Sequence, residues 1–370
     1  MHTAQPGPPV RTPDTRRAAA TCLERLTARR LAPPGTAVSP LGALRAAADC
    51  LERDVTTSTR VWIVRADARE PFPRTDAHRR ISAWPLRFLD PGRRFERPLL
   101  YLLHARAIDR LRLASIETVE RGIFVNDAET AASSWPKGVT PDVPYWLAAN
   151  GACTPYDPAS AHEAIAILRH ALRALYVAGE PGFFYLASHD DCWPGAKPLS
   201  AAAARAAFNG MVRAGRRASA GAAAHIRLCG AGSTLAQVMQ AADLLRDEWR
   251  IASTIWSCPS YTQLARDGRA AEHQNLLNPH DVPRIAHVRA CLGEDGTPVL
   301  AVTGYARHVA AQIGAFVPAR FTALGADSAG PGARVPTARW IAAVALRLLA
   351  DDGRVPAGWA AQAMRRYARG

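Results

Sequence analysis

HIRLCGAGSTLAQVMQAADLLRDEWRIASTIWS, residues 225–257, decides the fold class of this chain. Residues 225–229 and 252–257 are short runs of apolar and β-branched residues, which predicts two buried strands. Between them, apolar residues recur at helical spacing over 234–249, and Thr234 and Gln237 have the spacing of a capping box. A strand, a glycine turn, a helix and a second strand predict a βαβ unit in a mostly parallel sheet.

The same alternation of strands and helices extends to both sides of this unit. Two segments interrupt it, 71–98 and 131–158, and each contains five prolines, which predicts irregular chain and loops. Upstream, the patterns predict helices at 41–53, 162–176 and 199–212 and strands at 59–65, 98–104 and 183–187. Downstream, they predict strands at 299–303 and 321–324 and helices at 305–316 and 337–350.

The length of 370 residues allows two domains of ordinary size. We expect an α/β protein made of two doubly wound, mostly parallel-sheet domains. The expected order is a disordered tail with a short basic helix (1–37), a first domain (38–212), a flexible linker rich in Gly, Ala and Arg (213–224) and a second domain (225–370).

Composition limits the functional classes. The net charge is +14, but the arginines are dispersed among alanines, which disfavours a nucleic-acid or polyphosphate role. No apolar run reaches the ~18 residues of a membrane span, and the first 15 residues lack a signal core. Seven cysteines without a CxxC pair argue against a zinc site and favour a reducing cytoplasm.

Motifs with a known chemistry are weak or missing. The turn Gly230-Ala231-Gly232 lacks the third glycine of a dinucleotide site and the lysine of a P-loop, so we expect a structural turn. His189-Asp190-Asp191 is expected to be a loop at a strand end. No HExxH helix or Gly-x-Ser-x-Gly elbow occurs, and the other histidines considered as a general base show no metal-ligand spacing: 162, 170, 273, 280, 287 and 308. Chemistry alone therefore identifies no catalytic, cofactor-binding or metal-binding residue.

Several short segments carry a resemblance to a known family. They are Tyr156-Asp157-Pro158-Ala159, Phe183-Phe184-Tyr185-Leu186, Gly230-Ala231-Gly232-Ser233-Thr234-Leu235, Leu264-Ala265-Arg266-Asp267-Gly268, Asn278-Pro279, Val282-Pro283-Arg284, Phe316-Val317-Pro318 and Ala323-Leu324-Gly325. In this order they resemble the C-terminal half of the decarboxylating component of the bacterial, homodimeric-type pyruvate dehydrogenase complex. That component is a thiamine-diphosphate enzyme of the transketolase superfamily. The resemblance implies a pyrimidine-binding domain over 38–190 and a transketolase C-terminal domain over 225–370.

The resemblance also implies sites that this sequence does not supply. In the family, thiamine diphosphate lies between two domains of different subunits, and a Gly-Asp-Gly sequence with a later Asn holds the diphosphate and Mg²⁺. Gly-Asp-Gly does not occur in these 370 residues. The family's glutamate has no clear equivalent, since Glu70 and Glu96 are the nearest carboxylates. The family's histidine loop corresponds to 138–146, which contains no histidine, and 325–336 keeps only a trace of its acidic loop.

We therefore expect a divergent relative that lacks autonomous thiamine-diphosphate chemistry and serves as an assembly or regulatory subunit. Two alternatives remain: the small subunit of a split thiamine-diphosphate enzyme, whose partner supplies the diphosphate and Mg²⁺ site, and a basic binding module. The partners considered are a second copy, a diphosphate-binding subunit, a full-length homologue and an acyltransferase core. Trp135, Tyr145 and Trp146 are expected either to fill the former cofactor cleft or to cover exposed core.

Overall fold

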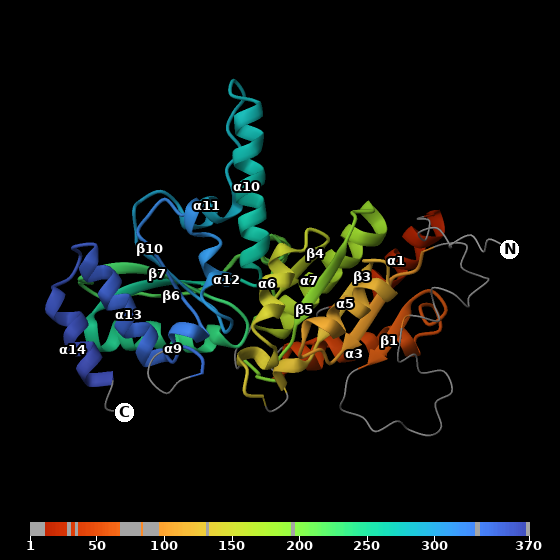
Figure 1. Ribbon diagram of the computed structural model, residues 1–370, viewed down its shortest axis with the longest axis horizontal. Coiled ribbons are helices and arrows are strands. Elements are labelled where there is room, and N and C mark those ends of the chain that lie inside the picture. Colours follow the sequence, from red (N-terminus) through yellow and green to blue (C-terminus); the bar gives the residue numbers. More distant parts are fainter. Residues whose placement is uncertain are drawn as a thin grey trace. The chain divides into compact units, whose positions relative to one another are not determined.

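The chain divides into two compact units, each built around a five-stranded sheet (Figure 1). The computed structural model describes residues 12–27, 31–33, 36–66, 83, 96–130, 133–193, 197–329 and 334–367. The first unit consists of Met1–Ser134, Gly138–Tyr156 and Ser160–Leu199, and the second of Trp135–Lys137, Asp157–Ala159 and Ser200–Gly370. Mostly parallel sheets with flanking helices confirm the expected α/β class.

The sheet of the first unit is parallel throughout, in the order β1-β2-β3-β5-β4. Every residue of β2, β3 and β5 is buried, as expected for strands covered on both faces. Phe124 and Phe183 stack on neighbouring strands with ring centroids 4.8 Å apart. The strands are β1 (Trp62–Ala66), β2 (Leu99–Leu103), β3 (Gly122–Asn126), β4 (Cys153–Tyr156) and β5 (Phe183–Ala187).

Helices cover both faces of this sheet. Helix α5 connects β2 to β3 and α6 connects β3 to β4, both in the same direction across the sheet, whereas α7 connects β4 back to β5. Because such connections are right-handed, α7 lies on the opposite face from α5 and α6. On that face α7 contacts α3 and α1. The helices are α1 (Pro13–Arg25), α3 (Pro40–Arg53), α5 (Ile108–Glu117), α6 (Asp142–Ala149) and α7 (Ala161–Leu172), which η3 (Arg173–Ala178) continues as a π-helix; η1 (Ala128–Thr130) is a single turn.

The sheet of the second unit has the order β10-β9-β7-β8-β6, and only β6 is antiparallel to its neighbour. The chain runs from β7 outward to β8 on one side, and from β9 outward to β10 on the other. The strand order therefore reverses between β7 and β9. The strands are β6 (Val212–Arg217), β7 (Ala224–Gly230), β8 (Ile251–Ser257), β9 (Val299–Val302) and β10 (Phe321–Leu324).

Helices α9 and α13 pack against each other, and α13 also packs against α14. Among the described residues, no helix is both long and apolar enough to cross a membrane. The helices of this unit are α8 (Ala201–Phe208), α9 (Thr234–Trp249), α10 (Tyr261–Leu277), α11 (His287–Leu292), α12 (His308–Ala311), α13 (Ala338–Asp351) and α14 (Ala357–Tyr367), with single turns η4 (Gly314–Phe316) and η5 (Ala326–Ser328). The turn η2 (Pro136–Gly138) begins in this unit and ends with Gly138 of the first.

The segment 131–158 was expected to be mostly loop, and this expectation is wrong for α6 and β4. Pro144 lies in the first turn of α6, where a backbone N–H has no intrahelical acceptor to lose. Pro155 lies in β4, an edge strand, where a missing donor breaks no ladder on the open side. Both prolines are thus compatible with regular structure.

The expected linker 213–224 is also wrong in its first half, because Val212–Arg217 forms β6. The strand lies at the sheet edge with exposed arginines and a register shift between Arg213 and Gly215, so its sequence lacks the apolar pattern of a buried strand. The change from the first to the second unit falls earlier, between Leu199 and Ser200.

Other expectations need smaller corrections. The predicted helix 305–316 is only α12 (His308–Ala311) followed by the turn η4. The capping box is wrong as well: Thr234 Oγ1 donates to Ala231 O, and Gln237 Oε1 accepts from Ala338 N. Of the expected tail 1–37, α1 is helical, whereas residues 1–11 lie outside the described residues, as do most of 71–98.

Candidate functional site

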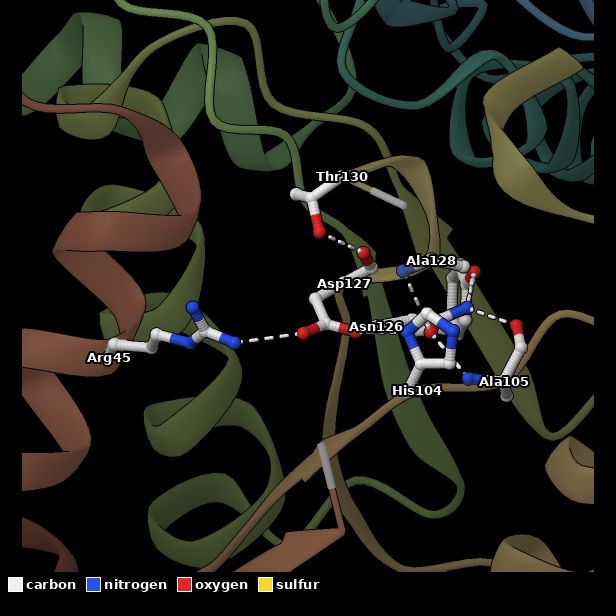
Figure 2. A network of polar contacts seen from close by, with 8 residues as sticks. Arg45, His104, Ala105, Asn126, Asp127, Ala128 and Thr130 are labelled. Atoms are coloured by element: carbon white, nitrogen blue, oxygen red, sulfur yellow. Dashed lines mark hydrogen bonds and ion pairs between the residues drawn. The ribbon is translucent and has the colours of Figure 1, made fainter. Parts of the chain in front are cut away.

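A polar network lies at the carboxyl edge of the first sheet, where ligands bind in many open α/β sheets (Figure 2). Strands β2 and β3 end at Leu103 and Asn126, so the next residues, His104 and Asp127, emerge side by side. The parallel register, Leu103 opposite Asn126, brings these two side chains together although 23 positions separate them in sequence.

Asp127 is the centre of this network. Its side chain is 2% exposed, and its two carboxylate oxygens have different partners. His104 Nδ1 lies 2.7 Å from Oδ1, and Arg45 Nη2, from α3, donates to Oδ2 at 2.8 Å. A carboxylate beside Nδ1 places the ring hydrogen there, which leaves Nε2 as the nitrogen that can accept a proton. This is the relation of a carboxylate to a general-base histidine, and the imidazole is 18% exposed.

Asn126 holds the surrounding loops. Its Oδ1 accepts from the N–H groups of Ala105 and Ala128 at 2.9 and 3.3 Å, and its Nδ2 donates to Ala105 O and Tyr185 Oη, both at 2.8 Å. All donors and acceptors of this buried amide are engaged, which makes it a positioning group that fixes the two strand ends.

A second polar site lies at the glycine turn that follows β7, where the strand order of the second sheet reverses. Gly232 has φ +52°, and a Cβ there would lie 2.0 Å from Asp157 Oδ1. The N–H of Gly232 donates to Asp157 O at 2.9 Å, and Asp157 N donates to Pro259 O at 2.6 Å. The backbone carbonyl of Asp157 therefore takes the Gly232 N–H, a donor that a phosphate would use at a glycine-rich turn, and the Asp157 carboxylate lies against the same glycine.

Lys137 balances this carboxylate. Its Nζ lies 2.9 Å from Asp157 Oδ1 and 5.6 Å from the ring centroid of Tyr305, and its side chain is 1% exposed. Lys137 has φ +58°, a conformation that L-residues seldom adopt. Gly304 makes room for it, since a Cβ there would lie 2.6 Å from Lys137 Cδ. The lysine and aspartate form a buried ion pair within the second unit.

The candidates considered from sequence do not gather into a site. His189 follows β5 in a loop, with Nδ1 3.9 Å from Asp191 Oδ2, and both aspartates after it are exposed. Glu96 pairs with Arg121 at 2.8 Å, at the opposite edge of the sheet from His104, and Glu70 lies outside the described residues. His162 is buried in the first turn of α7.

One cysteine–histidine contact was not anticipated. His287 Nε2 lies 3.6 Å from Cys291 Sγ and 3.0 Å from Met211 O. Burial raises the pKa of the Cys291 thiol to about 11, so this thiol stays protonated at neutral pH. A nucleophilic cysteine requires a lowered pKa, and this pair therefore does not qualify.

The aromatic residues of 135–146 have different environments. Trp146 is half-buried against Phe183 of the first unit, with ring centroids 6.4 Å apart. Trp135 and Tyr145 are 45% and 58% exposed. Trp146 thus covers core residues of the first unit, which agrees with the second of the two expectations for these aromatic residues.

Sequence reasoning missed His104, Asp127, Lys137 and Asp157 as chemical groups. A signal existed for the first two, because each follows an apolar strand directly and parallel strands end at one edge. Lys137 and Asp157 had no such signal, since their meeting depends on loops from distant parts of the chain.

Thiamine diphosphate, which the resemblance implies, can be tested against these groups. Mg²⁺ that accompanies a diphosphate would be held by one or two protein carboxylates, whose oxygens must be free for it. In the described part of the chain, no group of three or more His, Cys, Asp or Glu side chains could hold a metal ion. At the edge of the first sheet, the oxygens of Asp127 and Asn126 already have protein partners. These groups at the edge of the first sheet do not fit the diphosphate end of this cofactor.

Residues 215–339 match the family model of the transketolase-like TK C-terminal domain. The chain is 33% identical over 223 residues to the pyruvate dehydrogenase E1 component of Cupriavidus necator, which covers 58% of this chain and 25% of that protein. It is 31% identical over 227 residues to the same component of Pseudomonas aeruginosa, again 58% of this chain and 25% of the relative. The chain spans about a quarter of the length of these curated relatives.

Solved structures share the fold. A transketolase from Leishmania mexicana has a TM-score of 0.51 at 15% identity, over 92% of this chain and 50% of that one. A chain described as a split gene transketolase, inactive beta4 tetramer, also has a TM-score of 0.51, at 12% identity, over 85% of this chain and 99% of that one. At such identities the similarity shows the fold alone.

Proposed function

We propose that this chain, which carries a transketolase-like C-terminal domain and is related to the pyruvate dehydrogenase E1 components, acts as a subunit in an assembly without thiamine-diphosphate chemistry of its own. The observation that carries the proposal is the closed network at the edge of the first sheet. There, Asp127 is bound by His104 and Arg45, and Asn126 by backbone groups and Tyr185.

The hydrogen bonds of Asp127 would have to be broken before it could bind Mg²⁺, which supports the proposal. To bind Mg²⁺, Asp127 would have to give up a charge-assisted hydrogen bond to Arg45 as well as its bond to His104. Such bonds contribute about 1.5–3 kcal/mol each. The network therefore favours a fixed structural role for the carboxylate over metal ligation.

A second candidate function is the small subunit of a split thiamine-diphosphate enzyme, whose partner supplies the diphosphate and Mg²⁺ site. The match to 99% of a split gene transketolase chain favours it, because a chain with the same two-unit fold exists as a separate polypeptide. In this case His104 Nε2 would hold or accept a proton at the edge of the first sheet. A complete homologue or an acyltransferase core are further partners in this proposal.

The proposed compartment is the cytoplasm. All seven cysteines are free thiols, which supports a reducing environment.

Release of CO2 from pyruvate, with thiamine diphosphate and Mg²⁺ in excess, tests the proposal. We expect no release above the protein-free background for the chain alone. Catalysis by the chain alone would contradict the proposal. Catalysis that appears only when a diphosphate-binding chain is added, and is lost in His104→Ala, would establish the second candidate.

A further inference from the structure

Residues 192–242 carry positive charge only. This stretch contains one Lys and five Arg but no Asp or Glu, although acidic residues occur on both sides of it. Strand β6 lies inside the stretch and supplies three of the arginines. Because no carboxylate is near in sequence, the charge of this strand has to be compensated by a distant segment of the chain or by a partner.

The fold compensates one of the three arginines of β6. Arg217 pairs with Asp243 of α9, with Nε and Oδ1 2.6 Å apart. Arg213 and Arg216 are exposed and have no ion pair within the part of the chain that the structure describes. The strand therefore presents two guanidinium groups whose charge only solvent compensates.

A register shift places these two groups on one face of the sheet. Residues three positions apart in a regular strand point to opposite faces. Between Arg213 and Gly215 the register of β6 shifts, so that Arg213 lies opposite Trp256 and Arg216 opposite Thr254 of β8. Trp256 and Thr254 are two positions apart and lie on the same face. The shift thus brings both unpaired arginines to that face.

The positive charge continues across this face to β7. Arg227 lies opposite Thr254 on the other side of β8, so that Arg216 and Arg227 flank this threonine. Asp295 compensates Arg227 at 2.7 Å. The pKa of His225 lies below its ordinary value, because of burial first and then because of the charges of Arg227 and Arg216. An anion beside β6 would therefore meet the charges of several groups together.

The outer side of β6 is open. The strand ends the order of the second sheet and pairs with β8 alone. In the described chain, the backbone groups of 213–217 make no backbone hydrogen bond outside that ladder. Free N–H and C=O groups at a sheet edge are a template for another strand, whereas basic side chains repel a basic one. The edge of a second copy is therefore a poor partner for β6.

Charge and backbone together select the chemistry of the partner. A single-stranded nucleic acid would neutralise the arginines, but it has no amide groups for the edge, and β6 has no aromatic side chain on which a base could stack. An extended acidic peptide satisfies both requirements. Strand addition takes its affinity from main-chain hydrogen bonds and its specificity from alternate side chains.

We propose that the outer edge of β6 binds an extended acidic segment of a partner protein. This segment adds a strand to the second sheet, and its carboxylates, at alternate positions, lie beside Arg213 and Arg216. Side chains on adjacent strands are near enough to form such pairs. The inference rests on the assembly role proposed above and names the chemistry that one partner must have.

Fluorescence anisotropy of a labelled peptide, Thr-Val-Glu-Val-Glu-Val-Thr, with the full chain in about 50 mM salt tests the proposal. We expect saturable binding with a dissociation constant below about 1 mM. The double variant Arg213→Glu with Arg216→Glu should weaken binding about tenfold or more, because two attractive pairs become repulsive. Arg110→Glu with Arg112→Glu is the matched control: both residues are exposed on α5 of the first unit, and the change of net charge is the same.

Two further measurements separate strand addition from charge attraction. The same peptide with N-methylated backbone amides keeps both carboxylates but cannot form the ladder, so it should not bind. On saturation with the unmodified peptide, hydrogen exchange at the amides of 213–217 should slow, and this measurement needs no variant of the protein.

Several outcomes would overturn the inference. These are an absence of saturable binding up to about 1 mM, equal binding of the N-methylated peptide, or equal weakening in both double variants. Tighter binding of an oligothymidylate of the same charge would assign the surface to nucleic acid. The assay contains no cofactor and measures no CO2 release, so its failure is distinguishable from a failure of the proposed function.

Discussion

Lys137→Met is expected to destabilise the second unit strongly. Lys137 and Asp157 have side chains that are 1% and 9% exposed, so neither charge has water to replace its partner. Removal of one member of a buried ion pair costs about 3–5 kcal/mol, because the other charge stays buried. The lost contact of Nζ with the Tyr305 ring adds about 0.5–2 kcal/mol. Since whole domains are stable by about 5–15 kcal/mol, this is a large fraction of the total.

A double-mutant cycle with Asp157→Asn isolates the pair. The neutral double variant has no uncompensated charge, so it should lose less free energy of unfolding than the two single variants together, with a coupling of about 0.5–3 kcal/mol. Urea denaturation with hydrogen exchange at the Gly232 and Cys258 amides follows the second unit specifically. These amides donate to Asp157 O and Gly230 O.

An exposed pair provides the control for this cycle. Arg289→Met breaks the pair with Glu294, whose side chains are 50% and 64% exposed, and should cost no more than about 1 kcal/mol. The reasoning is refuted if Lys137→Met costs as little as Arg289→Met, since the pair would then be hydrated in solution.

Three further predictions concern the glycine turn, the edge network and alkaline pH. Gly232→Ala should lower the free energy of unfolding by at least about 1–3 kcal/mol, because φ is +52° and the new Cβ meets Asp157 Oδ1 at 2.0 Å; thermal unfolding measures it. Asp127→Asn should remove the carboxylate that fixes the hydrogen on His104 Nδ1, so the ring should populate the other tautomer, which nitrogen-15 NMR detects. Burial raises the pKa of the Cys22 thiol to about 12 from its ordinary 9.0. The neutral thiol therefore stabilises the fold fully below pH 9.0, and this stability is lost as the pH rises toward 12; denaturation at a series of pH values should show a shallower alkaline decline in Cys22→Ala.

Each of these three predictions has a control or an outcome that would contradict it. Gly221→Ala shares a positive φ of +60°, but its Cβ would meet only the end of the Arg250 side chain, so it should be the milder change. Equal losses at both glycines would contradict the argument from Asp157. An unchanged His104 tautomer in Asp127→Asn would show that another group fixes the ring. An identical alkaline decline in Cys22→Ala would remove Cys22 as its cause.

Patterns of apolar residues sufficed for much of the fold. The strand 183–187 and the helix 234–249 were predicted at the bounds that β5 and α9 have. Every residue of β5 is buried, so the strand is a continuous apolar run, and one face of α9 is buried, so its apolar residues recur at helical spacing along its whole length. Helix α10 was missed for the opposite reason. Half of it projects into solvent, so polar and apolar residues alternate there without a continuous stripe.

Loops and a linker were predicted wrongly from prolines and glycines whose position in the fold makes them compatible with regular structure. Pro144 and Pro155 suggested a loop, but a first helical turn and an edge strand both tolerate proline. Gly215 suggested a linker and instead lies beside the register shift of β6. In each case the composition was read correctly and the tertiary position was not available from the sequence.

The polar groups were harder to predict than the strands. His104 and Asp127 meet because β2 and β3 are neighbours, and sequence gives strand order only weakly. Lys137 and Asp157 belong to short segments that join the second unit while the sequence on both sides belongs to the first. No local sequence pattern indicates that a short segment packs in a different unit from its neighbours in the chain. The resemblance to the family could be recognised from short packing motifs in the sequence. Whether the polar groups could still bind the family's cofactor could be judged only from their side-chain contacts.

Calorimetric titration of thiamine diphosphate with Mg²⁺ into the purified chain tests the central claim most directly. The account predicts no binding heat for the chain alone, because the described edge of the first sheet has its carboxylate and amide oxygens bound by His104, Arg45 and backbone groups. Saturable, Mg²⁺-dependent binding to the chain alone would contradict it. Such a result would mean that the chain holds the cofactor with groups other than those of the network.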